Sequence, residues 1–415
     1  MTNNTIPALS CDRYSRFGEK CVEVGVCKST GVRIRLCYQT FGKRDAAGGV
    51  VLLIMGLASP SLLWDMKFCE CLASRGYYVI RFDNRDMGRS TFLTDRRVIP
   101  ATATNNSTRD EMDVWNTNIF SSSSSSSSAS ASASSSTSDS WFGAFGDSKL
   151  HLMRLAYASV VSGGHQLFRE VYTLEDMARD SVGLLDALNV YKAHIVGMCM
   201  GGMIAQLVAI YHPTRVESLS LLSTYSGTLQ AGRPSLREAF ALAQVATYIA
   251  RKGFAVSASL RGKNGKNSSP SPKDEKALAH TLVNLIARFA PEAKPSFSID
   301  REACFKQVQR ILRRSSDFSG VLRQYVALLN AEDRTAGLKR IHVPTVILHG
   351  TKDPIVPYVN GKQLAGMIPH AKLVTLEGVG HVLHPALREK IIDTLAANMQ
   401  QSRRGKQDLP TTSRL

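Results

Sequence analysis

Short apolar runs that alternate with helix-like segments are the feature that most constrains how this chain can fold. The run from Val50 to Met55 is continuously apolar, as is typical of a strand buried on both faces of a sheet. The segment from Leu62 to Arg75 has a helical pattern and stops at Gly76, a common residue just past the end of a helix. Tyr77 to Phe82 follows as a second buried strand. This alternation predicts β-α-β units and a mostly parallel sheet.

The same alternation continues through the rest of the chain. Thr173 and Asp176 have the spacing of a capping box and predict the start of a helix that continues to about Leu188. Further strands are expected at residues 20–28, 32–40, 194–196, 216–222, 345–348 and 372–376, and further helices at residues 201–211 and 385–399. These elements predict an α/β fold with eight strands.

Two long segments separate parts of this pattern. Residues 97–165 contain an unbroken serine run from Ser121 to Ser128, and such a composition buries too little apolar surface to offset the entropy of ordering. We therefore expect a disordered surface insertion. Residues 228–340 are helix-rich and basic. The predicted organisation is an N-terminal extension (1–17), a first core segment (18–227), a helical segment (228–340), a second core segment (341–399) and a flexible tail (400–415).

Composition argues against several classes of partner. The formal net charge of +17 suggests an anionic partner, but the basic residues are scattered, and no aromatic-interleaved basic stripe accompanies them. We therefore expect no nucleic-acid partner. The longest apolar runs have the length of strands, and the N-terminus lacks the pattern of a secretory signal, so we expect neither a membrane span nor a signal peptide.

Cofactors and metals also find no support in the sequence. The eight cysteines form no C-x-x-C pair and match no zinc spacing, so reduced thiols and no bound metal are expected. Neither a G-x-x-x-x-G-K-[ST] phosphate loop nor a G-x-G-x-x-G segment occurs. The prediction is an activity without a cofactor.

The strongest chemical signal is the segment Gly197-Met198-Cys199-Met200-Gly201, which lies between a predicted strand and a predicted helix. Small residues two positions before and after the central one allow a sharp strand-to-helix turn. Cys199 then lies at a helix N-terminus, whose partial positive charge stabilises a thiolate. The backbone N–H of Met200 and that of Leu57, at the end of another strand, are expected to form an oxyanion hole.

Two further segments supply an acid and a base. Asp353 follows the strand that ends at about Leu348, and His381 follows the last strand in Gly378-Val379-Gly380-His381. Asp353 can hold the tautomer of His381, and His381 can accept the proton of Cys199. The order nucleophile, acid, base is that of α/β-hydrolases. We predict a Cys199–His381–Asp353 triad, with Gly56, Trp64, Met198 and Tyr225 as candidates for the substrate pocket.

Longer segments resemble the α/β-hydrolases of the aclacinomycin methylesterase type. The matching segments are Val51 to Thr91, with Phe82-Asp83-Asn84-Arg85-Asp86-Met87-Gly88-Arg89-Ser90-Thr91, then Tyr172 to Gly227, with Met200-Gly201-Gly202-Met203-Ile204-Ala205-Gln206, and Ile341 to Thr394. The resemblance implies an eight-stranded sheet, a helical lid at about 228–340 and hydrolysis of carboxylic esters. The chain departs from it in the serine-rich insertion and in Cys199, which replaces the serine of the family.

A cysteine at this position resembles the dienelactone hydrolases, in which Cys, His and Asp open a lactone. We therefore predict hydrolysis of a carboxylic ester, thioester or lactone of a small acyl substrate through an acyl-enzyme. Two alternatives stay open: acyl transfer at the same site, and a catalytically silent relative that only binds ligands. The last residues, Ser413-Arg414-Leu415, resemble the peroxisomal Ser-Lys-Leu signal and predict an import receptor as partner and a peroxisomal or glycosomal location, with the cytoplasm as the alternative.

Overall fold

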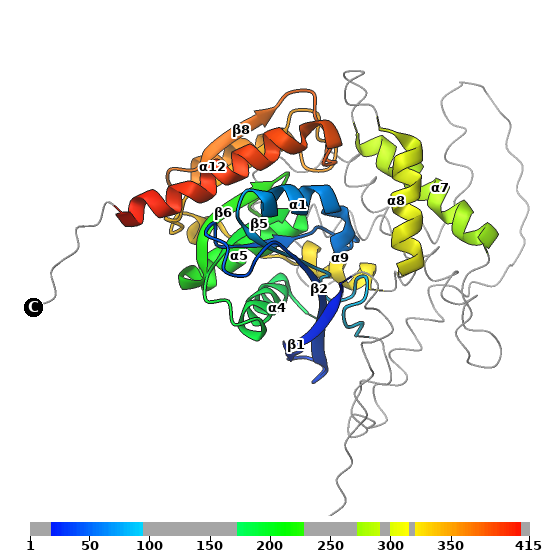
Figure 1. Cartoon of the computed structure of the whole chain (residues 1–415), viewed down its shortest axis with the longest axis horizontal. Coiled ribbons are helices and arrows are strands. Elements are labelled where there is room, and N and C mark those ends of the chain that lie inside the picture. Colours follow the sequence, from blue (N-terminus) through cyan, green and yellow to red (C-terminus); the bar gives the residue numbers. More distant parts are fainter. Residues whose placement is uncertain (1–17, 94–171, 228–271, 291–298, 315–319, 408–415) are drawn as a thin grey trace, which may run out of the picture.

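The computed structural model describes residues 18–93, 172–227, 272–290, 299–314 and 320–407, which form an eight-stranded sheet with helices on both faces (Figure 1). The strands lie in the order β1-β2-β4-β3-β5-β6-β7-β8. Their bounds are β1 Lys20–Val26, β2 Arg33–Phe41, β3 Val50–Ile54, β4 Tyr78–Phe82, β5 Ala193–Met198, β6 Val216–Leu222, β7 Thr345–Gly350 and β8 Lys372–Leu376. β2 is antiparallel to β1 and β4, and the remaining neighbours are parallel. The predicted mostly parallel, eight-stranded α/β fold is confirmed.

The helices form two layers and a separate group. α1 and α12 pack on one face of the sheet, α4, α5 and α11 pack on the other, and α7 lies against α8 at one end (Figure 1). The α-helices are α1 Met66–Ser74, α4 Leu174–Ala187, α5 Met200–Tyr211, α7 Pro272–Phe289, α8 Arg301–Arg314, α9 Val321–Leu329, α10 Thr335–Leu338, α11 Tyr358–Met367 and α12 Arg388–Gln407. Short 3-10 helices lie at η2 Ser61–Leu63, η5 Pro213–Arg215 and η7 Pro385–Leu387. Among the described helices, none is both long and apolar enough to cross a membrane.

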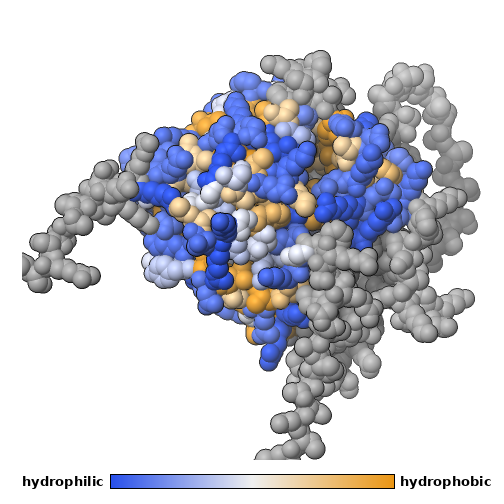
Figure 2. Space-filling model, viewed as in Figure 1, coloured by the Kyte–Doolittle hydropathy of each residue, from blue (hydrophilic) through white to orange (hydrophobic). Residues whose placement is uncertain are grey.

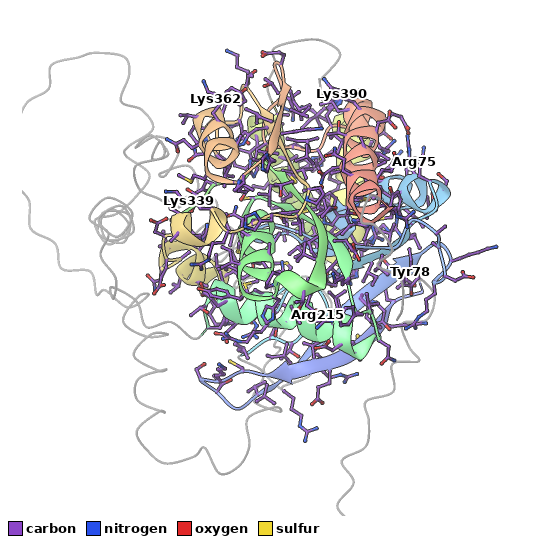
Figure 3. The ribbon with its side chains drawn as sticks, turned by 90° about the vertical axis from the view of Figure 1, so that its left-hand side faces the viewer. Arg75, Tyr78, Arg215, Lys339, Lys362 and Lys390 are labelled. Carbon is purple, nitrogen blue, oxygen red and sulfur yellow. The ribbon has the colours of Figure 1, made fainter. Side chains whose placement is uncertain are left out.

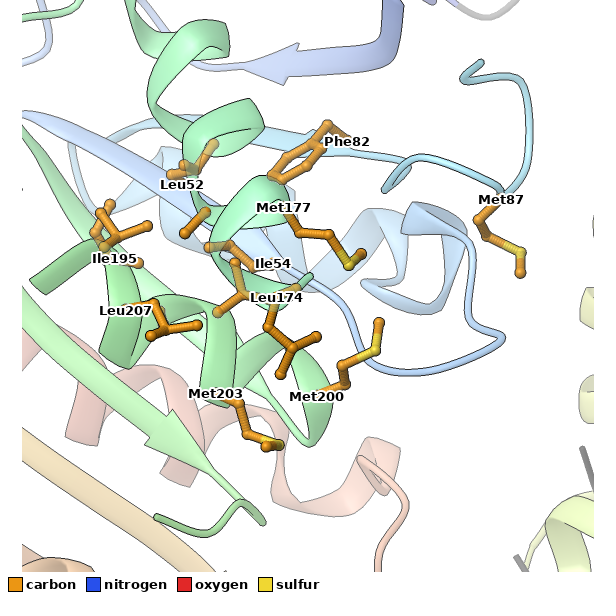
Figure 4. Packing of buried hydrophobic residues seen from close by; sticks show 14 of the residues in the cluster. Leu52, Ile54, Phe82, Met87, Leu174, Met177, Ile195, Met200, Met203 and Leu207 are labelled. Atoms are coloured by element: carbon orange, nitrogen blue, oxygen red, sulfur yellow. The ribbon is translucent and has the colours of Figure 1, made fainter. Parts of the chain in front are cut away.

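The apolar run in β3 is explained by the two cores of the protein. Leu52 and Ile54 are fully buried against α4 and α5, whereas Val51 and Leu53 are fully buried against the α1 and α12 side. Figure 4 shows part of the first of these cores, to which Leu52, Ile54 and Leu174 of α4 all belong. Because neighbouring residues of a strand point to opposite faces, a strand covered on both faces is apolar at every position.

Most predicted elements are confirmed, with differences at their ends. The capping box at Thr173 is present in full, because its side chain accepts the N–H of Asp176 and the Asp176 carboxylate accepts the N–H of Thr173. The predicted helix from Leu62 is split: η2 comes first, and α1 begins after Asp65, whose side chain accepts the Phe68 N–H.

The C-terminal boundary and one helix were not predicted correctly. α12 continues to Gln407, so the predicted tail at 400–415 begins too early. Gln and Arg favour helix, and Ser402 is buried, so this helix does not end with its last apolar residue. α11 was not predicted. The extension at 1–17, the serine-rich insertion at 97–165 and Ser413-Arg414-Leu415 lie outside the described residues.

Buried ion pairs fasten the predicted lid to the loop Asp83–Thr91, which follows β4. Arg314, the last residue of α8, is 2.6 Å from both Glu19 and Asp83. Arg323 of α9 donates to both carboxylate oxygens of Asp86, at 2.7 and 2.8 Å. These carboxylates are almost fully buried, so each requires its guanidinium partner to remain charged. Helices α8 and α9, which belong to the predicted lid, are therefore attached at fixed points on the core.

Basic charge is dispersed over the part of the surface that the structure describes. Figure 3 labels Arg75, Arg215, Lys339, Lys362 and Lys390, which come from separate parts of the chain. Some of this charge is paired locally: Arg75 binds two carboxylates of α12, and Arg215 binds one of α4. Figure 2 shows hydrophobic residues interspersed among hydrophilic ones on the face that it views.

Two helical glycines provide a matched test of this packing. A Cβ at Gly201 in α5 would lie 2.2 Å from the Ile54 carbonyl oxygen, whereas a Cβ at Gly366 in α11 would meet nothing within 4 Å. We expect Gly201→Ala to lower the free energy of unfolding by about 1–3 kcal/mol through overpacking. Gly366→Ala is expected to raise it by about 0.5–1 kcal/mol, because alanine favours helix more than glycine does. Chemical denaturation of both variants measures the difference, and equal stabilities would contradict the predicted close contact.

Candidate active site

Cys199 lies in the sharp turn between β5 and α5, in a backbone conformation that side-chain-bearing residues rarely adopt. Its φ is 54° and its ψ is −123°. A Cβ at Gly197 would lie 2.2 Å from the Gly201 carbonyl oxygen, and one at Gly201 would lie equally close to Ile54. Glycine at both positions is therefore what lets the turn form. Conformations of this kind cost about 1–3 kcal/mol and persist only where the surroundings impose them.

Hydrogen bonds around Cys199 hold this conformation. Its N–H donates to the Leu222 carbonyl at 3.0 Å, at the end of β6. Its carbonyl oxygen accepts the Thr224 hydroxyl at 2.7 Å and the Gly202 N–H at 2.9 Å. The position of Cys199 is thus fixed by the ends of two neighbouring strands, β5 and β6.

His381 and Asp353 form a hydrogen-bonded pair. The distance between His381 Nδ1 and Asp353 Oδ2 is 2.8 Å. The other oxygen of Asp353 accepts the backbone N–H groups of Ile355 and Val356, each at 2.9 Å. The Asp353 side chain is inaccessible to solvent, whereas the His381 side chain is 13% exposed. Within the pair, the imidazole of His381 is therefore exposed to solvent, whereas the carboxylate of Asp353 is not.

The pKa values of the pair follow from these contacts. Burial raises the pKa of Asp353, but the His381 charge and the hydrogen bonds to this carboxylate outweigh it, so the pKa is lowered overall. Burial lowers the pKa of His381, but the Asp353 charge and the adjacent Cys199 sulfur raise it well above its usual value. Since Nδ1 is bonded to Asp353, the other ring nitrogen is the one available to Cys199. The three predicted triad residues are thus brought together.

His349 packs against the loop that carries Asp353. Its Nε2 is 2.8 Å from the Val356 carbonyl oxygen and 3.8 Å from Asp353 Oδ2. Burial lowers the pKa of His349, so the ring is neutral and donates to Val356. A Cβ at Gly361 of α11 would lie 2.6 Å from His349 Nδ1, which shows how closely the helix packs on the ring. His349 is therefore held between α11 and the loop that carries Asp353.

The loop after β3 lies directly against Cys199. A Cβ at Gly56 would be 3.0 Å from Cys199 Cβ and 3.6 Å from its sulfur. Leu57 follows Gly56 and is partly buried. Met200 has its side chain in the core (Figure 4), and as the first residue of α5 its N–H has no acceptor within the helix. The positions of the loop after β3 and of the first residue of α5 suit the predicted oxyanion hole. The role of the Leu57 and Met200 N–H groups stays a prediction.

Two residues that hold this loop were not predicted from the sequence. Asn84 donates from its side chain to the Met55 carbonyl at 2.9 Å. Gln324 of α9 accepts the Ala58 N–H at 3.1 Å and donates to the Arg85 carbonyl at 2.8 Å. Ala58 has a φ of 55°, and Gln324 is fully buried. Asn84 lies in a segment already identified by resemblance, whereas no local pattern marks Gln324.

The predicted pocket residues have different surroundings. Met198 lines a narrow apolar pocket beside His381, together with residues of the two last strands and of α12. Tyr225 lies near the Cys199 sulfur, and burial raises the pKa of its phenol to about 12. Trp64 is fully buried in the core, with its ring centroid 5.2 Å from that of Phe68. Met198 and Tyr225 are thus close to the triad, Trp64 is part of the core, and their roles in substrate binding stay predictions.

The fold and the site together define the class of this protein. The family model described as alpha/beta hydrolase fold matches residues 49–385, most of the chain. The chain therefore belongs to the α/β-hydrolase fold family, and the predicted membership is confirmed. Among solved structures, it is similar to a thermophilic esterase from Thermogutta terrifontis (TM-score 0.53, 18% identity, 93% of this chain and 98% of that one). It is also similar to the enol-lactonase from Burkholderia xenovorans LB400 (TM-score 0.53, 17% identity, 88% and 97%).

Comparison with known sequences also finds relatives of this chain. The chain is 23% identical over 369 residues to rhodomycin D methylesterase DnrP from Streptomyces peucetius, covering 86% of this chain and 93% of the relative. It is 26% identical over 213 residues to the relative named putative carbamate hydrolase RutD from Pseudomonas syringae pv. syringae, covering 51% and 68%. The resemblance to methylesterases of this family, predicted from sequence motifs, is thereby confirmed.

The raised pKa of His381 gives a direct test of the triad geometry. In the wild-type protein we expect the imidazole to stay protonated to a pH well above about 6.5, the usual value for histidine. Asp353→Asn removes the larger of the two raising influences, so the pKa of His381 falls, and Cys199→Ala lowers it by less. NMR titration of the His381 ring measures both. Asp186→Asn, at an exposed carboxylate on α4, is the control, and an unchanged pKa in Asp353→Asn would contradict the assignment.

Proposed function

We propose that this protein hydrolyses a carboxylic ester, thioester or lactone, with Cys199 as nucleophile, His381 as general base and Asp353 as the orienting acid. The observation that carries the proposal is the position of His381, hydrogen-bonded to a buried carboxylate and adjacent to the sulfur of a strained strand-to-helix turn. The names of the relatives support the same reaction class, since they include a methylesterase, an esterase and an enol-lactonase.

In the acylation step, His381 holds the proton of Cys199, as its raised pKa favours, and the thiolate attacks the substrate carbonyl carbon. The carbonyl oxygen becomes an oxyanion, which the N–H groups of Leu57 and Met200 stabilise. The tetrahedral intermediate collapses when the carbon–oxygen or carbon–sulfur bond to the leaving group breaks. His381 returns its proton to that leaving group, and the acyl group stays on Cys199 as a thioester.

In the second step, water replaces the leaving group. His381 removes a proton from the water as it attacks the acyl-thioester, and the same N–H groups stabilise the second oxyanion. Collapse releases the carboxylic acid and restores the thiol with the proton from His381. Asp353 stays ionised throughout, since its lowered pKa keeps it charged beside the imidazolium.

The cysteine narrows the substrate class within this reaction. A thiol has a pKa of about 8.5, far below that of an aliphatic alcohol, so the intermediate expels the thiolate more readily than an alkoxide. Acylation of Cys199 by an unactivated ester is therefore disfavoured. Thioesters, enol lactones and aryl esters have acidic leaving groups, which the tetrahedral intermediate can expel in place of the Cys199 thiolate. We therefore propose these compounds as the substrates of this site.

Gln324 has a positioning role in this account, because it fixes the loop that presents Leu57. Gln324→Met keeps a similar volume but removes both the bond to Ala58 and the bond to Arg85. We expect kcat on p-nitrophenyl acetate to fall by about 10–100-fold with a smaller change in KM, as small misplacements of stabilising groups do.

Gln307→Met provides the matched control, because Gln307 of α8 also donates to a core carbonyl, that of Leu62, at 2.8 Å. It should leave kcat near that of the wild type. Accelerated hydrogen exchange of the Ala58 amide in Gln324→Met alone would locate the change at the loop. Equal losses of kcat in the two variants would indicate a general effect of loosening the lid and contradict the positioning role.

The nucleophile itself is tested by its dependence on the leaving group. Across p-nitrophenyl, phenyl and ethyl esters of one acid, we expect kcat/KM of the wild type to fall steeply as the leaving group becomes less acidic. Cys199→Ser should show a shallower dependence on the leaving group, because the tetrahedral intermediate does not expel the serine alkoxide in preference to the alcohol of the ester. Cys199→Ala should lose at least about a thousandfold in kcat/KM on the best substrate, as loss of a triad nucleophile does.

Other outcomes of this comparison distinguish the alternatives. Activity in Cys199→Ala near that of the wild type would contradict the role of Cys199. Activity in the serine variant alone, on esters, thioesters and lactones alike, would indicate a ligand-binding relative whose turnover was lost with the serine.

A further inference from the structure

A pair of cysteines far from Cys199 in the chain faces each other across two strands. Cys21 of β1 and Cys37 of β2 are directly opposite in the antiparallel ladder. β1 is the edge strand of the sheet, and Figure 1 shows it beside β2 at the end of the sheet remote from β8. Residues that are opposite in such a ladder have their side chains on the same face.

The backbone hydrogen bonds show which kind of cross-strand pair this is. The Cys37 N–H donates to the Ser90 hydroxyl and the Cys37 carbonyl accepts the Asp83 N–H, both at 2.9 Å. Both groups of Cys37 thus point toward the β4 side and away from β1. Cys21 and Cys37 are therefore a non-hydrogen-bonded pair, in which the Cα atoms lie about 4.5 Å apart and the side chains approach most closely. That separation falls within the range of about 4.4–6.8 Å that disulfides require.

The surroundings of the two thiols differ. Cys37 is 1% exposed, whereas Cys21 is partly exposed. The two thiols are in hydrogen-bond contact, and this contact, burial and the Asp83 charge raise the pKa of the Cys37 thiol. An Arg314 guanidinium nitrogen is 3.7 Å from the Cys37 sulfur. Cys21 is therefore the thiol that reagents reach, and Cys37 is its buried partner beside the residue that fastens α8 to the core.

We propose that Cys21 and Cys37 are a redox modification site, which closes reversibly into a cross-strand disulfide in the presence of a hydroperoxide. The Cys21 thiol loses its proton and its sulfur attacks one oxygen of the hydroperoxide. The O–O bond breaks, Cys21 becomes a sulfenic acid, and the leaving oxygen takes up the proton and departs as water or an alcohol. The Cys37 sulfur then attacks the sulfenic sulfur, the S–S bond forms, and the S–O oxygen leaves as water with the Cys37 proton. Two thiols are oxidised by two electrons, and a dithiol reductant restores them by exchange.

Other uses of the pair have less support. The described residues contain no group of three or more His, Cys, Asp and Glu side chains that could hold a metal ion. Cys27 shares the hairpin with the pair, but it is 1% exposed and its sulfur contacts Ser29 at 3.4 Å. Cys27 is therefore a nearby thiol for comparison, because the cysteine that faces Cys37 across the β1–β2 ladder is Cys21.

The test maps disulfides in the full, folded chain. The reduced protein is exposed to graded hydrogen peroxide, its remaining thiols are blocked with N-ethylmaleimide, and it is digested with trypsin without reductant. We expect mass spectrometry to find the peptide 21–28 linked to the peptide 36–43, and dithiothreitol to abolish the link. The link should be absent in Cys21→Ser and in Cys37→Ser.

Cys27→Ser is the matched control, because Cys27 lies in the same tryptic peptide as Cys21, and the link should persist in it. Cys199→Ser should also retain the link, since the site does not use the nucleophile. Persistence of the link in Cys21→Ser would assign it to Cys27 and overturn the proposal. So would its absence from the folded wild type at peroxide concentrations that oxidise Cys199, or its appearance only after unfolding in urea.

Discussion

The proposed chemistry of this protein depends on a single strained turn, in which Cys199 is held at a φ of 54° between β5 and α5. The turn exists because glycine at 197 and 201 lets the chain pass against itself and against Ile54. The turn places Cys199 at the N-terminus of α5 and its sulfur against Gly56, the position that the proposed attack and the proposed oxyanion hole both require. The backbone conformation that is unfavourable for a cysteine is thus the one that brings its sulfur beside His381.

The rest of the site is assembled by contacts between segments that are distant in sequence. Asp353 and His381 arrive on the loops after β7 and β8 and meet at 2.8 Å. The lid contributes to the site from its other side, because Arg323 binds Asp86 and Gln324 bridges Ala58 to Arg85. One helix of the predicted lid, α9, therefore holds the loop that faces Cys199.

Much of the fold, and the grouping of Cys199, His381 and Asp353, could be predicted from the sequence because the signals are local. The apolar run in β3, the glycines around Cys199 and the strand ends before Asp353 and His381 are each visible within a few residues. Gln324 could not be predicted, because its partner Ala58 is 266 residues away and its role depends on how the lid packs. Trp64, a predicted pocket residue, is fully buried in the core, and its role in substrate binding stays a prediction. The sequence pattern around a large apolar side chain near a loop does not distinguish a pocket position from a core position.

The most direct test of the account is to trap the acyl-enzyme. The wild-type protein is mixed with p-nitrophenyl acetate, quenched in acid during the first turnover, digested, and analysed by mass spectrometry. The account predicts one acetyl group on the peptide that contains Cys199, absent in Cys199→Ala and removed by neutral hydroxylamine, as a thioester is. Turnover of the ester with the acetyl group on another residue, or with the same adduct in Cys199→Ala, would contradict the assignment of Cys199 as the nucleophile.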